Sequence, residues 1–264
     1  MTHSVGMSMI EATLKRDRIV MLASLVALTA LSWVYLGILA RDMGGMSSAG
    51  DVMMATTLKP WTTLDFALML LMWAVMMVGM MLPSATPMIL LFTKVTRQSE
   101  EQEQPFTPAG VLVGGYVLVW ALFSIAATVL QWGLEQMALL SPSMISVSPY
   151  LGGGLLMAAG VYQLTPLKDV CLRHCRTPAG FVFTHWQPGI GGAFRMGVAH
   201  GAFCVGCCWV LMALLFVGGI MNLLWVAALA GFVLFEKIAP LGTKAGRMIS
   251  GFGLMVAGTL VLAF

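Results

Sequence analysis

The chain has 264 residues, of which 59% are hydrophobic and only 9% are charged, and its net charge is +3. Because a soluble domain carries about 25% charged residues, these charges cannot cover a globular surface of this size, and lipid must be the solvent for most of the chain. The basic residues lie in short clusters between apolar runs, which argues against an extended nucleic-acid-binding surface.

Seven apolar segments predict membrane-spanning helices, which need about 20 residues each. The segments cover residues 19–40, 64–94, 109–134, 150–167, 192–218, 221–235 and 248–264. The first is too long for the core of a signal peptide, so we expect it to be retained as a helix. The predicted fold class is an all-α, polytopic transmembrane bundle of about seven helices, formed as a single integral membrane domain over residues 1–264.

Lysine and arginine predict the orientation of these helices. Basic residues precede the first segment, follow the second, and lie between the fourth and fifth and between the sixth and seventh. These groups fall on one side if every segment spans, and the positive-inside rule makes that side cytoplasmic. The N-terminus with residues 1–18 and the polar stretch 97–108 are then cytoplasmic, and the C-terminus is extracytoplasmic. Glu236 and Lys237 end the sixth segment and are expected to form an interfacial pair.

The second segment combines two prolines with a stripe of methionines. Pro83 and Pro87 each remove a backbone donor, which predicts a kink or a break in that helix. Helical spacing places four thioethers on one face: Met69, Met72, Met76 and Met80. Apolar packing is the simpler account of this stripe by itself. Because a thioether binds Cu(I) without losing a proton, Met76 and Met80 are also candidate copper ligands.

The fifth segment carries the strongest signal, the pattern HGxxCxGCCW at residues 200–209. One face of a helix would carry four donors, with Cys208 beside them: Met196, His200, Cys204 and Cys207. Imidazole and thiolate suit zinc, whereas thiolate and thioether suit Cu(I). A single membrane cysteine is usually a small apolar residue. Three within five positions, one turn after a histidine that needs a polar partner, favour a metal site.

A second cluster precedes this segment and consists of Cys171, His174 and Cys175. A helix there would place all three on one face, at the cytoplasmic end of the fourth segment. Arg173 and Arg176 are expected to lower the pKa of the two thiols by favouring the thiolate. The alternative is a basic boundary loop whose cysteines are incidental.

All five cysteines lie between residues 171 and 208, and the intervening stretch contains prolines and glycines that allow it to fold back. We therefore hypothesise that the two clusters close one soft-metal site. Its expected ligands are Cys171, Cys175, Cys204 and Cys207, with His200 or Cys208 as further ligands and His174 as an additional candidate. The metal expected is copper, as Cu(I), with zinc as the alternative.

These motifs resemble a bacterial family, of undefined function, that is described as predicted metal-binding integral membrane proteins. The resemblance rests on MVGMMLPSATP (77–87), CLRHCRTP (171–178), GVAHGAFCVGCCWVLMALLF (197–216) and the segment 218–237 with GGIMNLLW and the terminal FEKIAP. It implies a multi-pass protein of the bacterial cytoplasmic (inner) membrane that binds metal through six residues: Cys171, Cys175, His200, Cys204, Cys207 and Cys208.

The function that the sequence favours is membrane handling of a soft metal, with copper first: transport, delivery, or service as a helper or subunit of a copper-dependent membrane complex. The expected partners are the lipid bilayer and either further membrane subunits or a copper enzyme. Two other classes also fit. CxxC-spaced cysteines suit a membrane thiol–disulfide oxidoreductase, and small residues with tryptophans suit a non-catalytic structural subunit. The sequence holds no hydrolase or phosphoryl-transfer motif, so an enzyme is not the favoured class.

Overall fold

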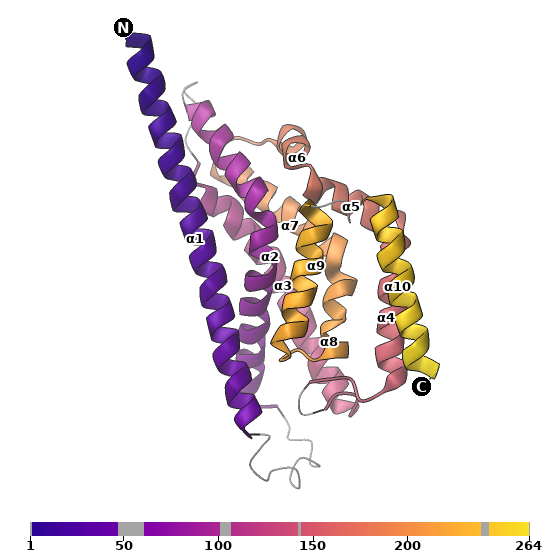
Figure 1. Ribbon diagram of the computed structural model, residues 1–264. Coiled ribbons are helices and arrows are strands. Elements are labelled where there is room, and N and C mark those ends of the chain that lie inside the picture. The colour runs from indigo at the N-terminus through magenta and orange to yellow at the C-terminus, as the bar shows by residue number, and fades with distance from the viewer. Residues whose placement is uncertain (1, 47–60, 101–106, 142–143, 239–242, 264) are drawn as a thin grey trace.

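The computed structural model is an all-α bundle that describes residues 2–46, 61–100, 107–141, 144–238 and 243–263 (Figure 1). In chain order its helices are α1 (Thr2–Met46), α2 (Thr63–Glu100), α3 (Ala109–Gln136), α4 (Pro149–Leu164), α5 (Pro166–Arg176), α6 (Pro178–His185), α7 (Gly189–Ala213), α8 (Leu215–Gly218), α9 (Leu223–Ile238) and α10 (Lys244–Ala263). The long helices run between two ends of the bundle. The short helices α5 and α6 lie at the end where α1 begins, opposite the C-terminus (Figure 1).

The described parts of all seven predicted segments are helical over most of their length. Five stretches are long and apolar enough to cross a membrane: α1, α2, α3, α10 and the continuous run of α7 and α8. α4 and α9 have 16 residues each, about 24 Å of helix against a hydrocarbon core of about 30 Å. Both run between the same two ends as the longer helices (Figure 1). Five candidate spans are therefore established, whereas seven spans remain a prediction.

The basic clusters of the sequence gather at one end of the bundle. The start of α1, the end of α2, helix α5 and the start of α10 all lie there (Figure 1). Residues 2–18 are the first turns of α1, and residues 97–100 of the expected polar loop belong to α2. The middle of that loop, residues 101–106, lies outside the described residues.

The expectation of an interfacial pair at Glu236 and Lys237 is wrong. Both side chains are buried, with 1% and 6% of their surface exposed. The Glu236 carboxylate accepts hydrogen bonds from Lys168 Nζ at 2.7 Å and from Gln163 Nε2 at 2.9 Å. Because these charges find partners inside the bundle, they do not need to reach the headgroup region.

Helix α2 continues without a break through Pro83 and Pro87. Its first turn is fixed by a reciprocal cap, in which Asp65 Oδ2 accepts from the backbone N–H of Thr62 and Thr62 Oγ1 accepts from that of Asp65. Most residues of α2 between Met72 and Phe92 are buried, so this helix runs through the core of the bundle. Because the helix is continuous through both prolines, the predicted break does not occur, whereas a kink there remains a prediction.

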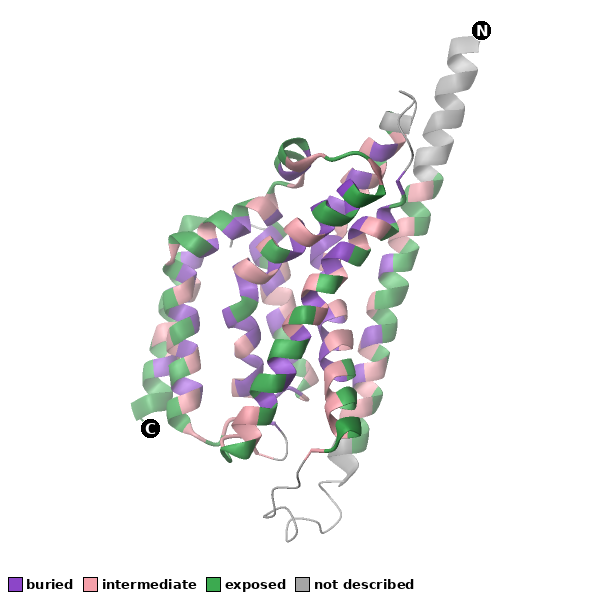
Figure 2. Ribbon diagram, turned by 180° about the vertical axis from the view of Figure 1, so that it is seen from behind, coloured by how far each residue is buried: buried purple, intermediate pink, exposed green. Residues whose placement is uncertain are grey.

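The outer helices pack through small residues and carry apolar faces for lipid. α4 and α10 approach closely at glycines: a Cβ on Gly160 would lie 2.7 Å from the carbonyl oxygen of Gly251. Figure 2 shows buried residues along the central helices and exposed faces on α1 and on the α4–α10 pair. The exposed residues of α1 include Val26 and Leu31, as expected of a helix whose outer face contacts lipid.

Candidate metal centre

Helix α5 carries the first cysteine cluster into the bundle. Thr165 Oγ1 accepts from the backbone N–H of Lys168 and Pro166 follows the cap, so the helix starts at a defined residue. Cys171 and Cys175, one turn apart, are both buried. The Cys175 side chain lies beside those of Cys204 and Cys207 on α7, close enough for both to raise its pKa.

Cys171 lies beside the same part of α7. Its Sγ would be 2.8 Å from a Cβ placed on Gly206, so the absence of a side chain at Gly206 makes room for the sulfur. The hydroxyl of Tyr162 donates to the Gly206 carbonyl and thus ties α4 to this turn. The two cysteine clusters, separate in the sequence, therefore meet in the fold.

The metal-binding stripe expected on α7 faces the core. Its four donors are at most 2% exposed: Met196, His200, Cys204 and Cys207. Cys208 is also fully buried, whereas Trp209 is 48% exposed and points away. Glycines set the distance to α3, since a Cβ on Gly197 would lie 2.0 Å from the carbonyl oxygen of Leu112. This close approach brings Tyr116 of α3 to the thiols.

Cys204 is at the centre of a polar group that sequence reasoning missed. Lys237 Nζ lies 2.9 Å from Cys204 Sγ and also donates to Ser84 Oγ at 2.8 Å. The Tyr116 hydroxyl lies 3.1 Å from the same sulfur and donates to the carbonyl oxygen of Met81. Three helices besides α7 therefore contribute polar atoms around one thiol. The sequence feature that could have indicated this group is Lys237 at the end of an apolar helix. The same feature is also typical of a lysine that extends to the headgroup region.

The remaining thiols of α7 are turned toward the backbone. Cys207 Sγ and Cys208 Sγ donate to the carbonyl oxygen of Cys204 at 3.1 and 3.0 Å. Across the described part of the chain, no group of three or more His, Cys, Asp or Glu side chains has the arrangement of a metal site. The thiols are thus gathered but hydrogen-bonded, and their assignment as ligands remains a prediction.

The pKa expected for the α5 thiols is corrected by the structure. Burial raises the pKa of Cys171 above its usual value. Hydrogen bonds to Cys204 and Cys207, followed by burial, raise the pKa of Cys175 well above its usual value. The arginines do not reverse this, because Arg173 is 68% exposed and pairs with Asp169. Both thiols face inward, away from the charges expected to activate them.

The two histidines of the motifs differ in position. His200 is 2% exposed and its Nδ1 has no hydrogen-bond partner among the described residues. Its ring packs against Tyr116 and Phe181, at centroid distances of 5.8 and 5.2 Å. His174 is half-buried; its ring stacks on Phe203 at 4.0 Å and its Nδ1 donates to the Val170 carbonyl. His200 therefore has an unused ring nitrogen, whereas His174 is held outside the thiol cluster.

The methionine stripe of α2 lies in the core. Met76 and Met80 are at most 2% exposed. Met81 follows Met80 on the same helix. Its carbonyl oxygen accepts hydrogen bonds from the hydroxyls of Tyr116 and Ser84. The stripe therefore leads toward the thiol cluster, and its packing role and its copper role are both compatible with this burial.

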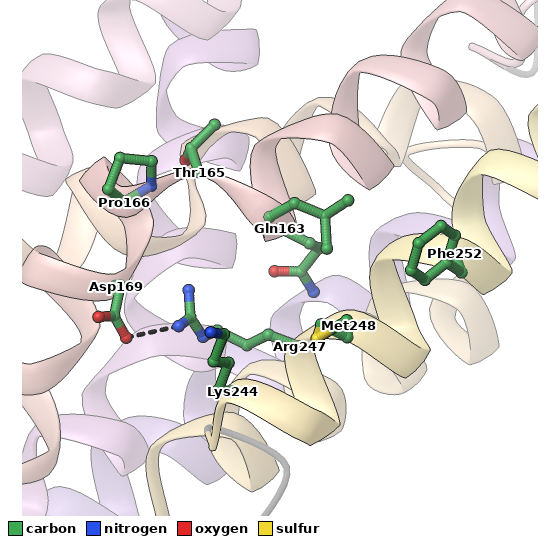
Figure 3. A pocket seen from close by; sticks show the side chains of 9 residues that line it. Gln163, Thr165, Pro166, Asp169, Lys244, Arg247, Met248 and Phe252 are labelled. Atoms are coloured by element: carbon green, nitrogen blue, oxygen red, sulfur yellow. Dashed lines mark hydrogen bonds and ion pairs between the residues drawn. The ribbon is translucent and has the colours of Figure 1, made fainter.

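A cavity of about 450 Å³ lies elsewhere, between α4, α5 and α10 (Figure 3). Its polar lining includes Arg247, which pairs with Asp169 at 2.6 Å, together with Gln163 and Lys244. None of the residues lining it is a cysteine or a histidine. With a guanidinium and an ammonium in its wall and no thiol, this cavity is not suited to a soft cation.

Comparison with curated proteins and with solved structures finds no match. A model of the PpoB2 family, described as copper chaperone, matches residues 70–261, a range that holds all five cysteines, the methionine stripe except Met69, and Lys237. The copper function expected from the sequence is thereby confirmed at the level of the family. Because the match covers more than half of the chain, this protein, with its five candidate membrane helices, belongs to the PpoB2 family of copper chaperones.

Proposed function

We propose that the thiols where α5 meets α7 hold the Cu(I) cargo of this chaperone. The observation that carries the proposal is the contact of Cys175 with Cys204 and Cys207, which gathers thiols from two motifs into one buried cluster. Thiolates are soft ligands and bind Cu(I) in preference to harder ions. We assign these three cysteines as the principal ligands.

Further donors surround this cluster. Cys208 is buried beside Cys207, Cys171 flanks the cluster at Gly206, and His200 offers an unpartnered ring nitrogen. Their number would let copper move between ligand sets without leaving the protein, as release to a partner requires. Zinc is less favoured, because thiolates are soft ligands that suit Cu(I) and the family that this chain matches is described as copper chaperone.

The contact between Lys237 and Cys204 also supports the proposal. A buried ammonium beside a sulfur means that this position in the apolar interior accommodates one positive charge. Cu(I) carries the same charge and would replace the ammonium next to the sulfur, while Lys237 retains its hydrogen bond to Ser84. Cys207 and Cys208 would turn away from the Cys204 carbonyl, which needs only a change of rotamer.

We further propose that the end with α5 and α6 faces the cytoplasm of a bacterium and that the bundle spans its inner membrane seven times. The basic residues at that end support this orientation, Arg173 being 68% exposed there. The cargo would pass to a copper-dependent partner, an enzyme or a membrane subunit. The exposed residues of α5 and α6 at this end form the surface nearest to the buried thiols, so the transfer would take place there.

The test is a Cu(I) titration of the full-length protein in mild detergent under reducing conditions, in competition with a chromophoric Cu(I) chelator. We expect the double variant Cys204→Ser and Cys207→Ser to lose tight copper binding. Ala202→Ser is the matched control, since it adds a serine to the exposed face of the same helix. Unchanged copper stoichiometry in the double cysteine variant would contradict the proposal.

The same thiol contact favours a second candidate, thiol–disulfide exchange. Cys175 and either Cys204 or Cys207 are close enough to hydrogen-bond, and all five cysteines are reduced in this structure. An oxidoreductase would form a mixed disulfide with its substrate, which a Cys207→Ser variant would trap. Copper that survives purification, without a trapped disulfide, favours the chaperone.

A further inference from the structure

A second group of soft ligands lies at the opposite end of the bundle, around the side-chain amide of Gln131. The Gln131 nitrogen Nε2 approaches three acceptors: Met144 Sδ at 3.4 Å, Met69 Sδ at 3.8 Å and Glu135 Oε1 at 2.8 Å. They come from α2, from α3 and from the segment that follows α3. Two thioethers and one carboxylate thus converge on a single atom.

Two tryptophans fix this arrangement. Trp73 Nε1 donates to Gln131 Oε1 at 2.7 Å, which orients the amide so that its nitrogen faces the sulfurs. Trp61 Nε1 donates to Glu135 Oε2 at 2.8 Å and holds the other oxygen of the carboxylate. Gln131 is fully buried and Met144 is 7% exposed. The group is therefore built by packing and hydrogen bonds, and is not a set of surface side chains.

The Gln131 amide cannot form good hydrogen bonds with all three of these acceptors. An amide nitrogen has two hydrogens for three acceptors, and an N–H bond to a thioether is weak. Glu135 pairs with no cation among the described residues, its partners being the neutral N–H groups of Gln131 and Trp61. A soft monovalent cation would be bound by both sulfurs and neutralised by the carboxylate, so its chemistry matches the group better than the amide does.

The same helix joins this group to the thiol cluster. Met69 is followed on α2 by the buried Met72, Met76 and Met80. The run from Met69 to Met80 spans about 16 Å of helix. Beyond it, Met81 and Ser84 contact Tyr116 and Lys237, which both reach Cys204. A line of thioethers inside the bundle therefore leads from this group toward the thiol cluster.

We propose that Met69, Met144 and Glu135 form a second Cu(I) site, which collects the ion at the end of the bundle opposite α5 and α6 and passes it along the methionines of α2 to the thiol cluster. This inference rests on the proposed function, because the thiol cluster is the destination of the ion. Gln131 occupies the site in the free protein and would rotate aside when the metal binds.

The experiment uses Ag(I), a soft monovalent ion that is not reduced or oxidised in air, and the full-length protein labelled with ¹³C at its methionine methyl groups. The Met69→Leu and Met144→Leu variants assign the two resonances and keep the packing volume. We expect both resonances to shift on addition of Ag(I), and to shift equally in the Cys204→Ser and Cys207→Ser double variant. Glu135→Gln should weaken binding about tenfold, because the site loses its charge.

Met137→Leu is the matched control, since this methionine lies two positions after Glu135 but is 71% exposed. Its substitution should leave Ag(I) binding unchanged. Unshifted Met69 and Met144 resonances in a protein whose thiols bind the ion would overturn this inference and leave the proposed function intact. Shifts at both methionines in a protein whose thiols bind nothing would support the second site and refute the thiol cargo site.

Discussion

The ammonium of Lys237 lies 2.9 Å from the sulfur of Cys204, in the buried interior of the helix bundle. Its second partner, Ser84, lies 153 positions earlier in the chain, so the contact joins three helices. A buried charge is costly without a partner, and the two side chains should therefore depend on each other energetically.

Removing the sulfur should destabilise the copper-free protein because it leaves the ammonium with one fewer acceptor. We expect Cys204→Ala to lower the free energy of unfolding by about 2–4 kcal/mol, and Lys237→Met, which removes the buried charge itself, to lower it by much less. The double variant should be less destabilised than the sum of the two, with a coupling of about 1–3 kcal/mol. Thermal unfolding in detergent, after copper removal with a chelator, measures all three values. Additive effects would show that the two groups do not interact.

Lys168 and Glu236 form a buried ion pair whose side chains are almost fully inaccessible. The cost of removing one charge of this pair can therefore be compared with the cost of removing both. Glu236→Gln keeps the shape but leaves the ammonium without a counter-charge, so we expect a loss of about 3–5 kcal/mol. Replacing both residues by methionine removes both charges and should recover most of that loss. Thermal unfolding again provides the measurement. A double variant less stable than Glu236→Gln would mean that the pair itself stabilises the bundle.

Close packing of α4 against α10 predicts opposite responses at two glycines of one helix. A Cβ on Gly160 would meet the Gly251 carbonyl oxygen at 2.7 Å, so Gly160→Ala should lower the free energy of unfolding by about 1–3 kcal/mol. At Gly154 nothing lies within 4 Å. Gly154→Ala should be neutral or slightly stabilising, because alanine is the better helix former. Equal effects at both positions would mean that the helices do not pack as described.

Much of this fold could be predicted from the sequence, because membrane helices are local features. Long apolar runs identify them, and lysine and arginine place their ends at one side of the bundle. Helical periodicity within single segments places Cys171 and Cys175 on one face of their helix. It also predicts the buried stripe of donors that ends at Cys207. Their meeting was also predictable, since only a short stretch separates the two clusters.

Contacts between distant segments could not be predicted in the same way. Tyr116 reaches Cys204 across 88 positions of the sequence, and no periodicity links them. A charged pair at the end of an apolar run, such as Glu236 and Lys237, has the same sequence signature whether it snorkels to the headgroups or turns inward. The proton state of the α5 thiols depends on this same packing, so the effect of the neighbouring arginines was misjudged.

The pH dependence of metal binding should distinguish the thiol cluster from the methionine site. The pKa values of Cys171 and Cys175 are raised, so these thiols hold their protons in the free protein near neutral pH. Cu(I) must displace the protons of the thiols that bind it, and affinity must therefore fall as pH falls, by about tenfold per pH unit for each proton released. Competition titrations with the wild-type protein at several pH values measure this slope.

Thioethers carry no proton to release, so the site at Met69 and Met144 should behave differently. In the Cys204→Ser and Cys207→Ser double variant, we expect the affinity for Ag(I) to be nearly constant across neutral pH. The wild-type protein should then favour the methionine site in acid and the thiol cluster in base, which drives the ion from one to the other as pH rises. A thiol cluster whose Cu(I) affinity does not change with pH would mean that its ligands are already thiolates, in conflict with the burial and hydrogen bonding of Cys175.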